Sequence, residues 1–276
     1  MKFRKLSPIE IILTSMLVLF LILGIFHKKV VEEENNEYHF STSKINEIDK
    51  SKIRSISGKY SYEDDKFTSS FGIDVSTFQD DINWEKVKND DVEFAFIRIG
   101  RRGAVDGLIH EDDLFEANYS GAKENEINIG VYFFSQAINT DEAIEEARWV
   151  LDKLKDKKIE LPIVYDCEDV YLTDEEARIN NLSKEEITAN ALAFLDEINN
   201  SGYLGMIYSY LSWADDNYEM ELLNDYPYWF AQYDVDIPSS PHPINIWQYS
   251  DKGTINGINH PVDLNIMFVG KQENEQ

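Results

Sequence analysis

The sequence is poor in cysteine and in basic side chains. Its one cysteine, Cys167, cannot form an intramolecular disulfide, and no paired Cys and His spacing of the zinc-site type occurs. The chain has 26 Lys and Arg residues against 52 Asp and Glu residues, which gives a formal net charge of −26. This balance argues against nucleic acid as a partner, because nucleic-acid binding depends on basic side chains that neutralise phosphates. We attribute the acidic excess to solubility.

Motifs of three other classes are also missing. The five histidines are scattered and form no H-E-x-x-H arrangement, so we expect neither a metal nor another cofactor. No G-x-S-x-G elbow supports an esterase. A doubly wound open sheet should carry a glycine-rich phosphate turn after its first strand, and "DVSTFQ" is not such a turn. We therefore keep a doubly wound open sheet only as the alternative to a barrel.

The first thirty residues differ from the rest of the chain in being apolar and basic. Residues 11–26 carry no charge; apart from Glu10, the charged side chains that flank them are basic: Lys2, Arg4, Lys5, Lys28 and Lys29. A run of this length is close to the minimum of about 17 residues for crossing a bilayer. We predict a single-pass transmembrane anchor over residues 1–30, with the rest of the chain outside the cytoplasm. A cleaved signal peptide is the alternative, but no small-x-small cleavage site follows the apolar run.

Residues 31–68 are polar and charged, with only scattered apolar positions. This composition is typical of a flexible linker. A linker of this length would span on the order of 30–40 Å, enough to hold a domain off a membrane. We expect the folded domain over residues 69–272.

From residue 71 onward, apolar runs with the length of strands alternate with amphipathic stretches. Eight runs are candidate strands: 71–76, 94–100, 127–134, 161–166, 205–210, 228–233, 244–249 and 262–269. Helical patterns separate the first five, most clearly at residues 140–155, where Thr140 is a candidate N-cap. The last three runs are joined by short loops that contain Pro and Gly. This order predicts an α/β fold, a parallel TIM-like barrel with an irregular last third.

Carboxylates stand at the ends of several candidate strands. Asp74 ends the first strand, Asp166 and Glu168 end the fourth, and Asp263 lies in the last. Chemistry in a barrel is expected at the carboxyl ends of its strands. Because residues two apart in an extended chain face the same way, Asp166 and Glu168 should point together. Converging carboxylates suit glycosidic bond cleavage, which needs a protonated acid and negative charge beside a developing positive ring.

The neighbours of these acids have simpler expected roles. Cys167 should point to the opposite side of the strand and pack as a small buried hydrophobe. We expect Asp169 to cap a loop or to be solvated.

Seven segments, taken in order and spacing, resemble the glycoside hydrolase family 25 lysozymes. They are "FGIDVSTFQDDINWEKVK", "FAFIRIG", "NIGVYFFSQAINTDEAIEEA", "LPIVYDCE", "GYLGMIYSYLSW", "YWFAQY" and "INIWQYSDKGTINGINHPVDLN". The resemblance covers about residues 70 to 270 and implies a flattened barrel with five β/α units and three final strands. It also implies an N-acetylmuramidase that cuts the β-1,4 bond between N-acetylmuramic acid and N-acetylglucosamine, with peptidoglycan glycan strands as its partner.

The resemblance assigns roles to the four acids. The family's first-strand aspartate falls on Asp74, its D-x-E pair on Asp166 and Glu168, and its last-strand aspartate on Asp263. Glu168 is then the general acid. Asp166 either orients the substrate's acetamido group or acts as the nucleophile itself.

Aromatic side chains suited to stacking on sugar faces accompany the strands. We expect substrate contacts from Tyr132, Tyr208, Tyr233 and Trp247. Phe134 and Trp84 are expected to serve core packing instead. Arg101 stands where many members of the family have an aromatic residue, which bears on substrate preference.

Two other functions stay open on the sequence. A chitinase-like glycosidase would also use a D-x-E pair on its fourth strand, and activity on chitin oligomers but not on cell walls would select it. A non-catalytic cell-wall-binding module would keep the aromatic residues and lose the acids, which this chain has not done.

The predicted anchor can be tested on whole cells. Protease added to intact protoplasts should remove the domain from the membrane, because the charge-flanked apolar run places it outside. The released fragment is measured by immunoblotting, with a cytoplasmic protein as the control for lysis. A domain that stays protected would contradict this location.

Overall fold

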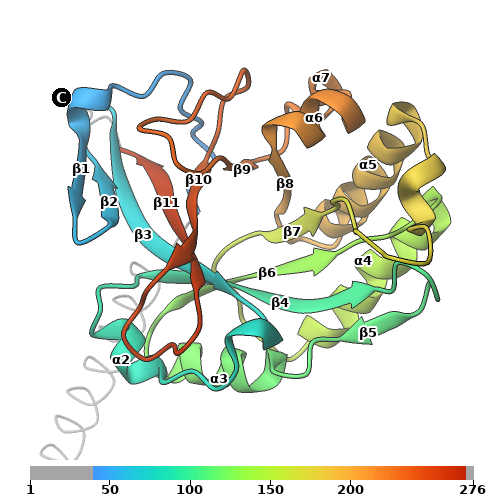
Figure 1. Ribbon diagram of the computed structural model, residues 1–276, viewed down its shortest axis with the longest axis horizontal. Coiled ribbons are helices and arrows are strands. Elements are labelled where there is room, and N and C mark those ends of the chain that lie inside the picture. The colour runs from blue at the N-terminus through green and yellow to red at the C-terminus, as the bar shows by residue number, and fades with distance from the viewer. Residues whose placement is uncertain (1–39, 272–276) are drawn as a thin grey trace, which may run out of the picture. The chain divides into compact units, whose positions relative to one another are not determined.

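The computed structural model describes residues 40–271, which form a closed barrel (Figure 1). The ring runs in the order β3, β11, β10, β9, β8, β7, β6, β4 and closes where β4 pairs with β3. Its strands are β3 (Phe67–Val75), β4 (Phe94–Arg102), β6 (Asn128–Phe134), β7 (Ile163–Asp166), β8 (Gly205–Tyr210), β9 (Tyr228–Ala231), β10 (Ile246–Gly253) and β11 (Val262–Gly270). A short strand, β5 (Ile109–Glu111), pairs with β4 outside the ring. All eight candidate strands are therefore present.

The sequence predicted a parallel barrel with an irregular last third, and the irregularity lies in the direction of one strand. Seven strands of the ring are parallel, but β11 runs antiparallel to both β10 and β3. The reason is the short connection from β10, since a parallel return needs a crossover of a dozen or more residues. One consequence concerns Asp263, which lies at the start of β11 and yet pairs with Asp74 near the end of β3.

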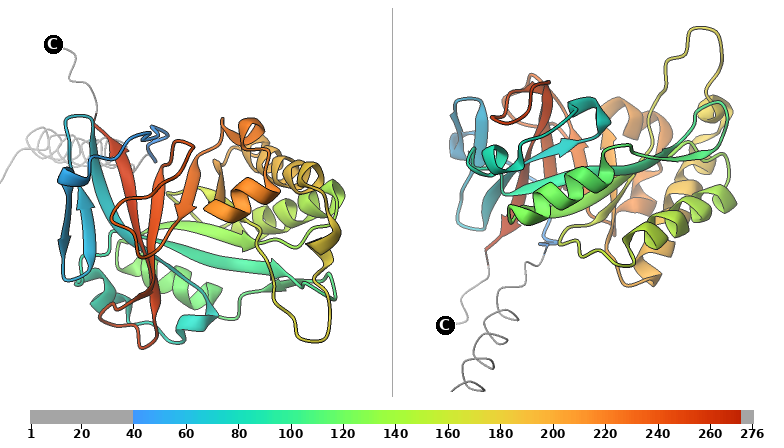
Figure 2. Two further views of the ribbon diagram at one scale, coloured as in Figure 1. Left: turned by 45° about the horizontal axis from the view of Figure 1, so that its top comes forward. Right: turned by 90° about the horizontal axis from the view of Figure 1, so that it is seen from below.

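Helices cover the outside of the first part of the barrel. They are α2 (Trp84–Lys88), α3 (Phe115–Glu124), α4 (Thr140–Leu154), α5 (Lys184–Asn200), α6 (Leu211–Asn217) and α7 (Met220–Leu223), with short 3-10 turns η2 (Thr77–Gln79) and η3 (Arg178–Asn181). Figure 2 shows α3 and α4 lying along the sheet, where they contact β4 and β6. The N-cap of α4 is Asn139, whose side chain accepts from the Glu142 amide, and not Thr140 as expected.

The two faces of the strands carry different side chains. Inward positions alternate with outward ones along each strand, as a barrel requires. The interior is filled with apolar groups, including Phe94 and the stacked pair Phe96 and Trp229, whose ring centroids lie 4.7 Å apart. Gly72 and Gly130 make room for the two phenylalanines, because a Cβ at either position would lie 2.5 Å or less from a ring atom. The polar inward residues lie above this layer.

The chain before β3 is folded wherever the structure describes it. Turn η1 (Lys50–Lys52) leads into a hairpin of β1 (Ile53–Ile56) and β2 (Lys59–Tyr62), which lies beside β3 and β11 in Figure 1. Tyr60 stacks on Tyr249 with centroids 4.4 Å apart, and Tyr62 is buried against Phe268. The predicted flexible linker over 31–68 is wrong for residues 40–68, because most of their apolar side chains, such as Ile45, Tyr60 and Tyr62, pack against the barrel.

The expected membrane anchor lies outside the described residues. None of the helices between residues 40 and 271 is long and apolar enough to cross a membrane.

The packing of the hairpin predicts that residues 40–68 stabilise the barrel. A chain that begins at residue 69 should be less stable than one that begins at residue 40, by roughly 3–5 kcal/mol, the scale for losing a large buried side chain. Tyr62 is 2% exposed and would be lost. Chemical denaturation of the two chains gives the difference. As a control, Ile56→Ser next to the hairpin turn, where Ile56 is 76% exposed, should change stability by less than about 0.5 kcal/mol. Equal denaturation midpoints for the chains that begin at residues 40 and 69 would restore the linker interpretation.

Candidate active site

A pocket opens at the carboxyl ends of the parallel strands and contains all four predicted acids. Besides Asp74, Asp166, Glu168 and Asp263, it is lined by Ser76, Phe78, Gln79, Arg98, Tyr132, Phe134, Tyr208, Trp229 and Gln248. These residues come from strands β3, β4, β6, β7, β8, β9, β10 and β11 and from the segments that follow them. The barrel thus joins acids that lie almost 200 residues apart in the chain.

Asp74 and Asp263 face each other across the β3–β11 pair. Asp74 accepts hydrogen bonds from Gln248 at 2.8 Å and from Asn265 at 2.7 Å. Burial raises the pKa of Asp74, although these two amides oppose the shift. Burial and the adjacent charge of Asp74 raise the pKa of Asp263 to about 9. A proton is therefore held on this pair at neutral pH, chiefly on Asp263, which donates toward Asp74.

Asp166 and Glu168 form the second pair of acids. Burial and the charge of Glu168 raise the pKa of Asp166 well above its ordinary value, and burial also raises the pKa of Glu168. Two carboxyl groups in one buried site cannot both ionise easily, so this pair also retains a proton. One oxygen of Asp166, Oδ1, has no hydrogen-bond partner among residues 40–271. That oxygen is free to accept a hydrogen bond from a ligand.

Gln248 connects the two sides of the pocket. Its Nε2 donates to Asp74 and, at 3.4 Å, to Asp263, while its Oε1 accepts from Tyr208 at 2.9 Å and Tyr233 at 2.6 Å. Asn265 acts similarly, since its Oδ1 accepts from Trp229 Nε1 at 2.9 Å. The sequence analysis did not identify these amides. The spacing could have identified Asn265, because it is two residues from Asp263 and therefore on the same strand face.

The aromatic residues are divided differently from the prediction. Tyr132 and Tyr208 line the pocket, and Tyr233 reaches it through Gln248. Trp247 does not, because it is fully buried on the outer face of β10, where its Nε1 donates to the Gln232 carbonyl and its ring packs near Tyr60. The assignment of Trp247 to substrate binding is contradicted by its position one residue from the inward Gln248.

Four further aromatic residues complete the comparison. Phe134 lines the pocket, so its assignment to core packing was wrong. Trp84 is 5% exposed and packs in the core as expected. Trp229 and the exposed Phe78 were not identified as pocket residues, although Trp229 lies in a predicted strand.

Charged residues around the pocket show how its rim is held. Arg98 pairs with buried Asp112 at 2.7 Å and lies 5.0 Å from the centre of the Phe78 ring. Arg101 is exposed and lines a neighbouring hollow that shares Arg98 with the pocket. Asp169 accepts from the Tyr210 hydroxyl at 3.2 Å.

Cys167 is buried, and burial raises its thiol pKa well above the ordinary value, in agreement with its expected packing role.

The raised pKa of Asp263 predicts a pH dependence of stability. Between its ordinary pKa of 3.8 and about 9, the folded chain holds a proton that the unfolded chain has released. Stability therefore falls as pH rises through this window. Asp263→Asn should reduce the fall by at most about 1.4 kcal/mol per pH unit, the value for one proton. Denaturation from pH 5 to 9 measures the free energy of unfolding of each chain, with the exposed Asp113→Asn as the control. Parallel plots of this free energy against pH for Asp263→Asn and the parent would contradict the prediction.

Comparison with known proteins agrees with this geometry. The chain is 28% identical over 193 residues to the autolytic lysozyme of Clostridium acetobutylicum, covering 70% of this chain and 54% of that protein. It is 32% identical over 213 residues to the uncharacterised protein YegX of Escherichia coli K12, covering 74% and 71%. Among solved structures, the autolysin LytC of Streptococcus pneumoniae, in complex with a synthetic peptidoglycan ligand, matches with a TM-score of 0.64 and 21% identity over 78% of this chain and 51% of that one.

The chain thus spans about half the length of the autolytic lysozyme and of LytC. The sequence model of the glycosyl hydrolases family 25 matches residues 73–258, which run from Ile73 in β3, next to Asp74, to the loop before β11. By this match, the chain belongs to the glycosyl hydrolases family 25.

Proposed function

We propose that this chain is a peptidoglycan hydrolase, an N-acetylmuramidase that cleaves the β-1,4 bond between N-acetylmuramic acid and N-acetylglucosamine. One observation carries the proposal: four carboxyl groups converge in a single pocket together with aromatic side chains. Asp166 ends β7 and Glu168 lies two residues further, while the other two face them from β3 and β11. Family membership and the autolytic lysozyme among its relatives support the same reaction.

Glu168 serves as the general acid. Glycosidic bond cleavage needs a carboxyl group that is still protonated near neutral pH at the leaving oxygen. Burial raises the pKa of both Glu168 and Asp166, and the charge of Glu168 raises the pKa of Asp166 further, so the pair retains a proton. When Glu168 gives its proton to the leaving oxygen, the charge that remains on the pair stabilises the positive sugar ring.

Asp166 acts on the other side of the reaction. Its unpartnered Oδ1 can accept a hydrogen bond from the N–H of a substrate acetamido group, which would hold that group toward the sugar carbon. Asp74, held by Gln248 and Asn265, can supply negative charge in the same pocket to stabilise the positive ring. Tyr132, Tyr208 and Trp229 give the sugar rings apolar faces to pack against.

The alternatives differ in what they require of the pocket. A binding module has no use for buried carboxyl groups, whose desolvation costs stability. The four buried acids therefore favour catalysis. A chitinase-like glycosidase would share the acids, and substrate choice separates it from a muramidase.

The location of the enzyme follows from its substrate. The proposed anchor over residues 1–30 would place the catalytic domain outside the cell membrane, where peptidoglycan lies. The basic amino-terminal flank supports this orientation.

Glu168→Gln tests the reaction and the assignment of its acid. The variant should lower kcat by a factor of roughly 10² or more, the usual size for loss of positioned acid catalysis, and should keep its fold because glutamine is nearly isosteric. Mass spectrometry of muropeptides released from purified walls should show new reducing ends on N-acetylmuramic acid with the parent chain.

Three results would contradict the proposal. Parent-rate digestion by a folded Glu168→Gln chain would remove Glu168 from the reaction. Reducing ends on N-acetylglucosamine would assign a different bond. Cleavage of chitin oligomers without cleavage of walls would select the chitinase-like alternative.

A further inference from the structure

The backbone around Glu168 lacks the support that Asp166 has. Asp166 is the last residue of β7; its carbonyl accepts from the Ser135 amide at 2.7 Å, and it pairs with Tyr208 of β8. Glu168 lies beyond the strand, in a stretch from 167 to 177 that forms neither helix nor strand. A general acid needs a fixed position, since small displacements cost large factors in rate. Something other than the sheet must therefore hold Glu168.

One side chain provides this support. Gln136, completely buried just after β6, donates from Nε2 to the carbonyl oxygen of Glu168 at 3.1 Å. Among the described residues, no other hydrogen bond reaches the backbone of Glu168. The side chain of Gln136 is thus the anchor of the carboxyl end of the D-x-E segment.

The same residue also holds the far end of the loop. The carbonyl oxygen of Gln136 accepts from Arg178 Nη1 at 3.1 Å, and Arg178 is the first residue of η3. Arg178 in turn makes a two-pronged ion pair with Glu142 of α4, at 2.9 and 2.7 Å. Gln136 therefore fastens both ends of the loop from Glu168 to Arg178, which carries the 94% exposed Tyr171 at its outer side.

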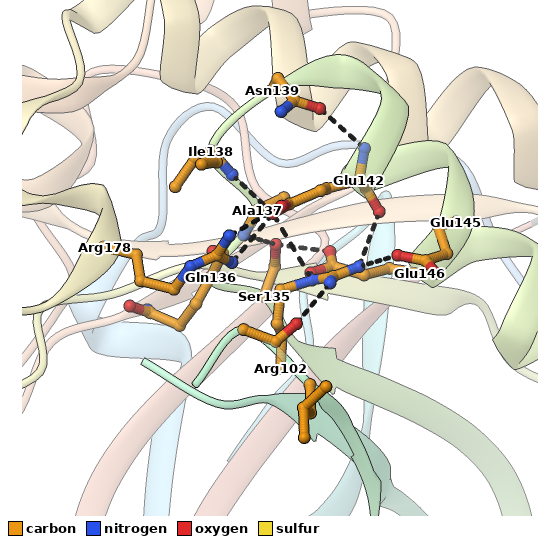
Figure 3. A network of polar contacts seen from close by, with 12 residues as sticks. Arg102, Ser135, Gln136, Ala137, Ile138, Asn139, Glu142, Glu145, Glu146 and Arg178 are labelled. Carbon is orange, nitrogen blue, oxygen red and sulfur yellow. Dashed lines mark hydrogen bonds and ion pairs between the residues drawn. The ribbon is translucent and has the colours of Figure 1, made fainter. Parts of the chain in front are cut away.

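A network of polar contacts holds the segment that carries Gln136 (Figure 3). Ser135 Oγ donates to buried Glu146 at 2.6 Å, and the Ile138 amide donates to Glu142 at 3.1 Å. Arg102 donates to Glu146 from the other side at 2.6 Å. Side chains of α4 and β4 thus fix the segment on which Gln136 is mounted.

We propose that Gln136 is a positioning residue for the general acid Glu168, and that Arg178 completes the same clamp from the other end of the loop. The expected change in kcat and pH profile rests on the proposed function. The expected change in the position of the loop rests on the hydrogen bonds and ion pairs alone. Without the Gln136 contact, Glu168 moves away from Asp166 and toward water. Its carboxyl then ionises at lower pH, because burial is what disfavours its charged form.

Gln136→Met tests the clamp, because methionine keeps the length and volume and removes the donor. Its folding is favoured by the loss of Gln136 Oε1, a buried acceptor without a partner among residues 40–271. We expect kcat to fall by a factor of roughly 10 to 100 with little change in KM. At a temperature where the variant stays folded over the whole pH range, the alkaline limb of the activity profile should move to lower pH, because Glu168 ionises more easily.

Asn190→Leu is the matched control. Asn190 donates to the carbonyl of Ala137, next to Gln136, and within residues 40–271 it makes no hydrogen bond to Glu168 or Arg178. Asn190→Leu should lower the free energy of unfolding while leaving the alkaline limb of the activity profile in place at temperatures where the variant stays folded. Arg178→Met, at a partly exposed position, serves as a second variant in case Gln136→Met does not fold, and should shift the limb in the same direction by a smaller amount.

Amide hydrogen exchange of residues 167–178 gives a readout that does not need activity. Exchange should be faster in Gln136→Met and Arg178→Met than in the parent, and unchanged in Asn190→Leu. Wild-type kcat, pH profile and exchange in both clamp variants would overturn the inference. An inactive parent chain would instead refute the proposed function, and the exchange rates would still decide whether Gln136 holds the loop.

Discussion

The structure depends on one costly arrangement, the burial of four carboxyl groups at one end of a barrel. Ionised carboxylates are expensive to remove from water, so each must be hydrogen-bonded, paired or protonated. The chain uses all three solutions: amides from Gln248 and Asn265 for Asp74, a raised pKa for Asp263, and a shared proton for Asp166 and Glu168. The same solutions make the pocket reactive, because a retained proton is what an acid catalyst must supply.

The layers of the barrel explain why this arrangement can be maintained. Below the acids, the interior is filled by large apolar side chains such as Phe96 and Trp229, and these keep water out from one side. Around them, outward side chains pack under the helices and under the amino-terminal hairpin. The surroundings of Glu168 are the exception, because its backbone leaves the sheet. There, support comes from Gln136 and from the ion pair of Arg178 with Glu142.

Sequence reasoning was most accurate where a side chain's role depends on strand position alone. The eight strands and the four acids follow from apolar runs that end in carboxylates, and the structure brings these acids together. It was wrong where the role depends on which face of a strand a residue occupies. Trp247 and Gln248 are neighbours, and the sequence analysis assigned Trp247 to substrate binding, but Gln248 faces the pocket. Likewise, Tyr60 and Tyr62 looked like linker residues because their partners, Tyr249 and Phe268, lie about 200 positions away.

The sequence by itself determined the order of the elements, the identity of the four acids and the family, because these depend on local patterns and spacings. Only the tertiary structure decided the reversed direction of β11, the amides that hold Asp74 and the clamp behind Glu168. These features join residues such as Gln136 and Glu168, or Asp74 and Asn265, across different strands. Closure of the barrel fixes such pairings, and no local periodicity encodes which side chains will meet when a sheet closes on itself.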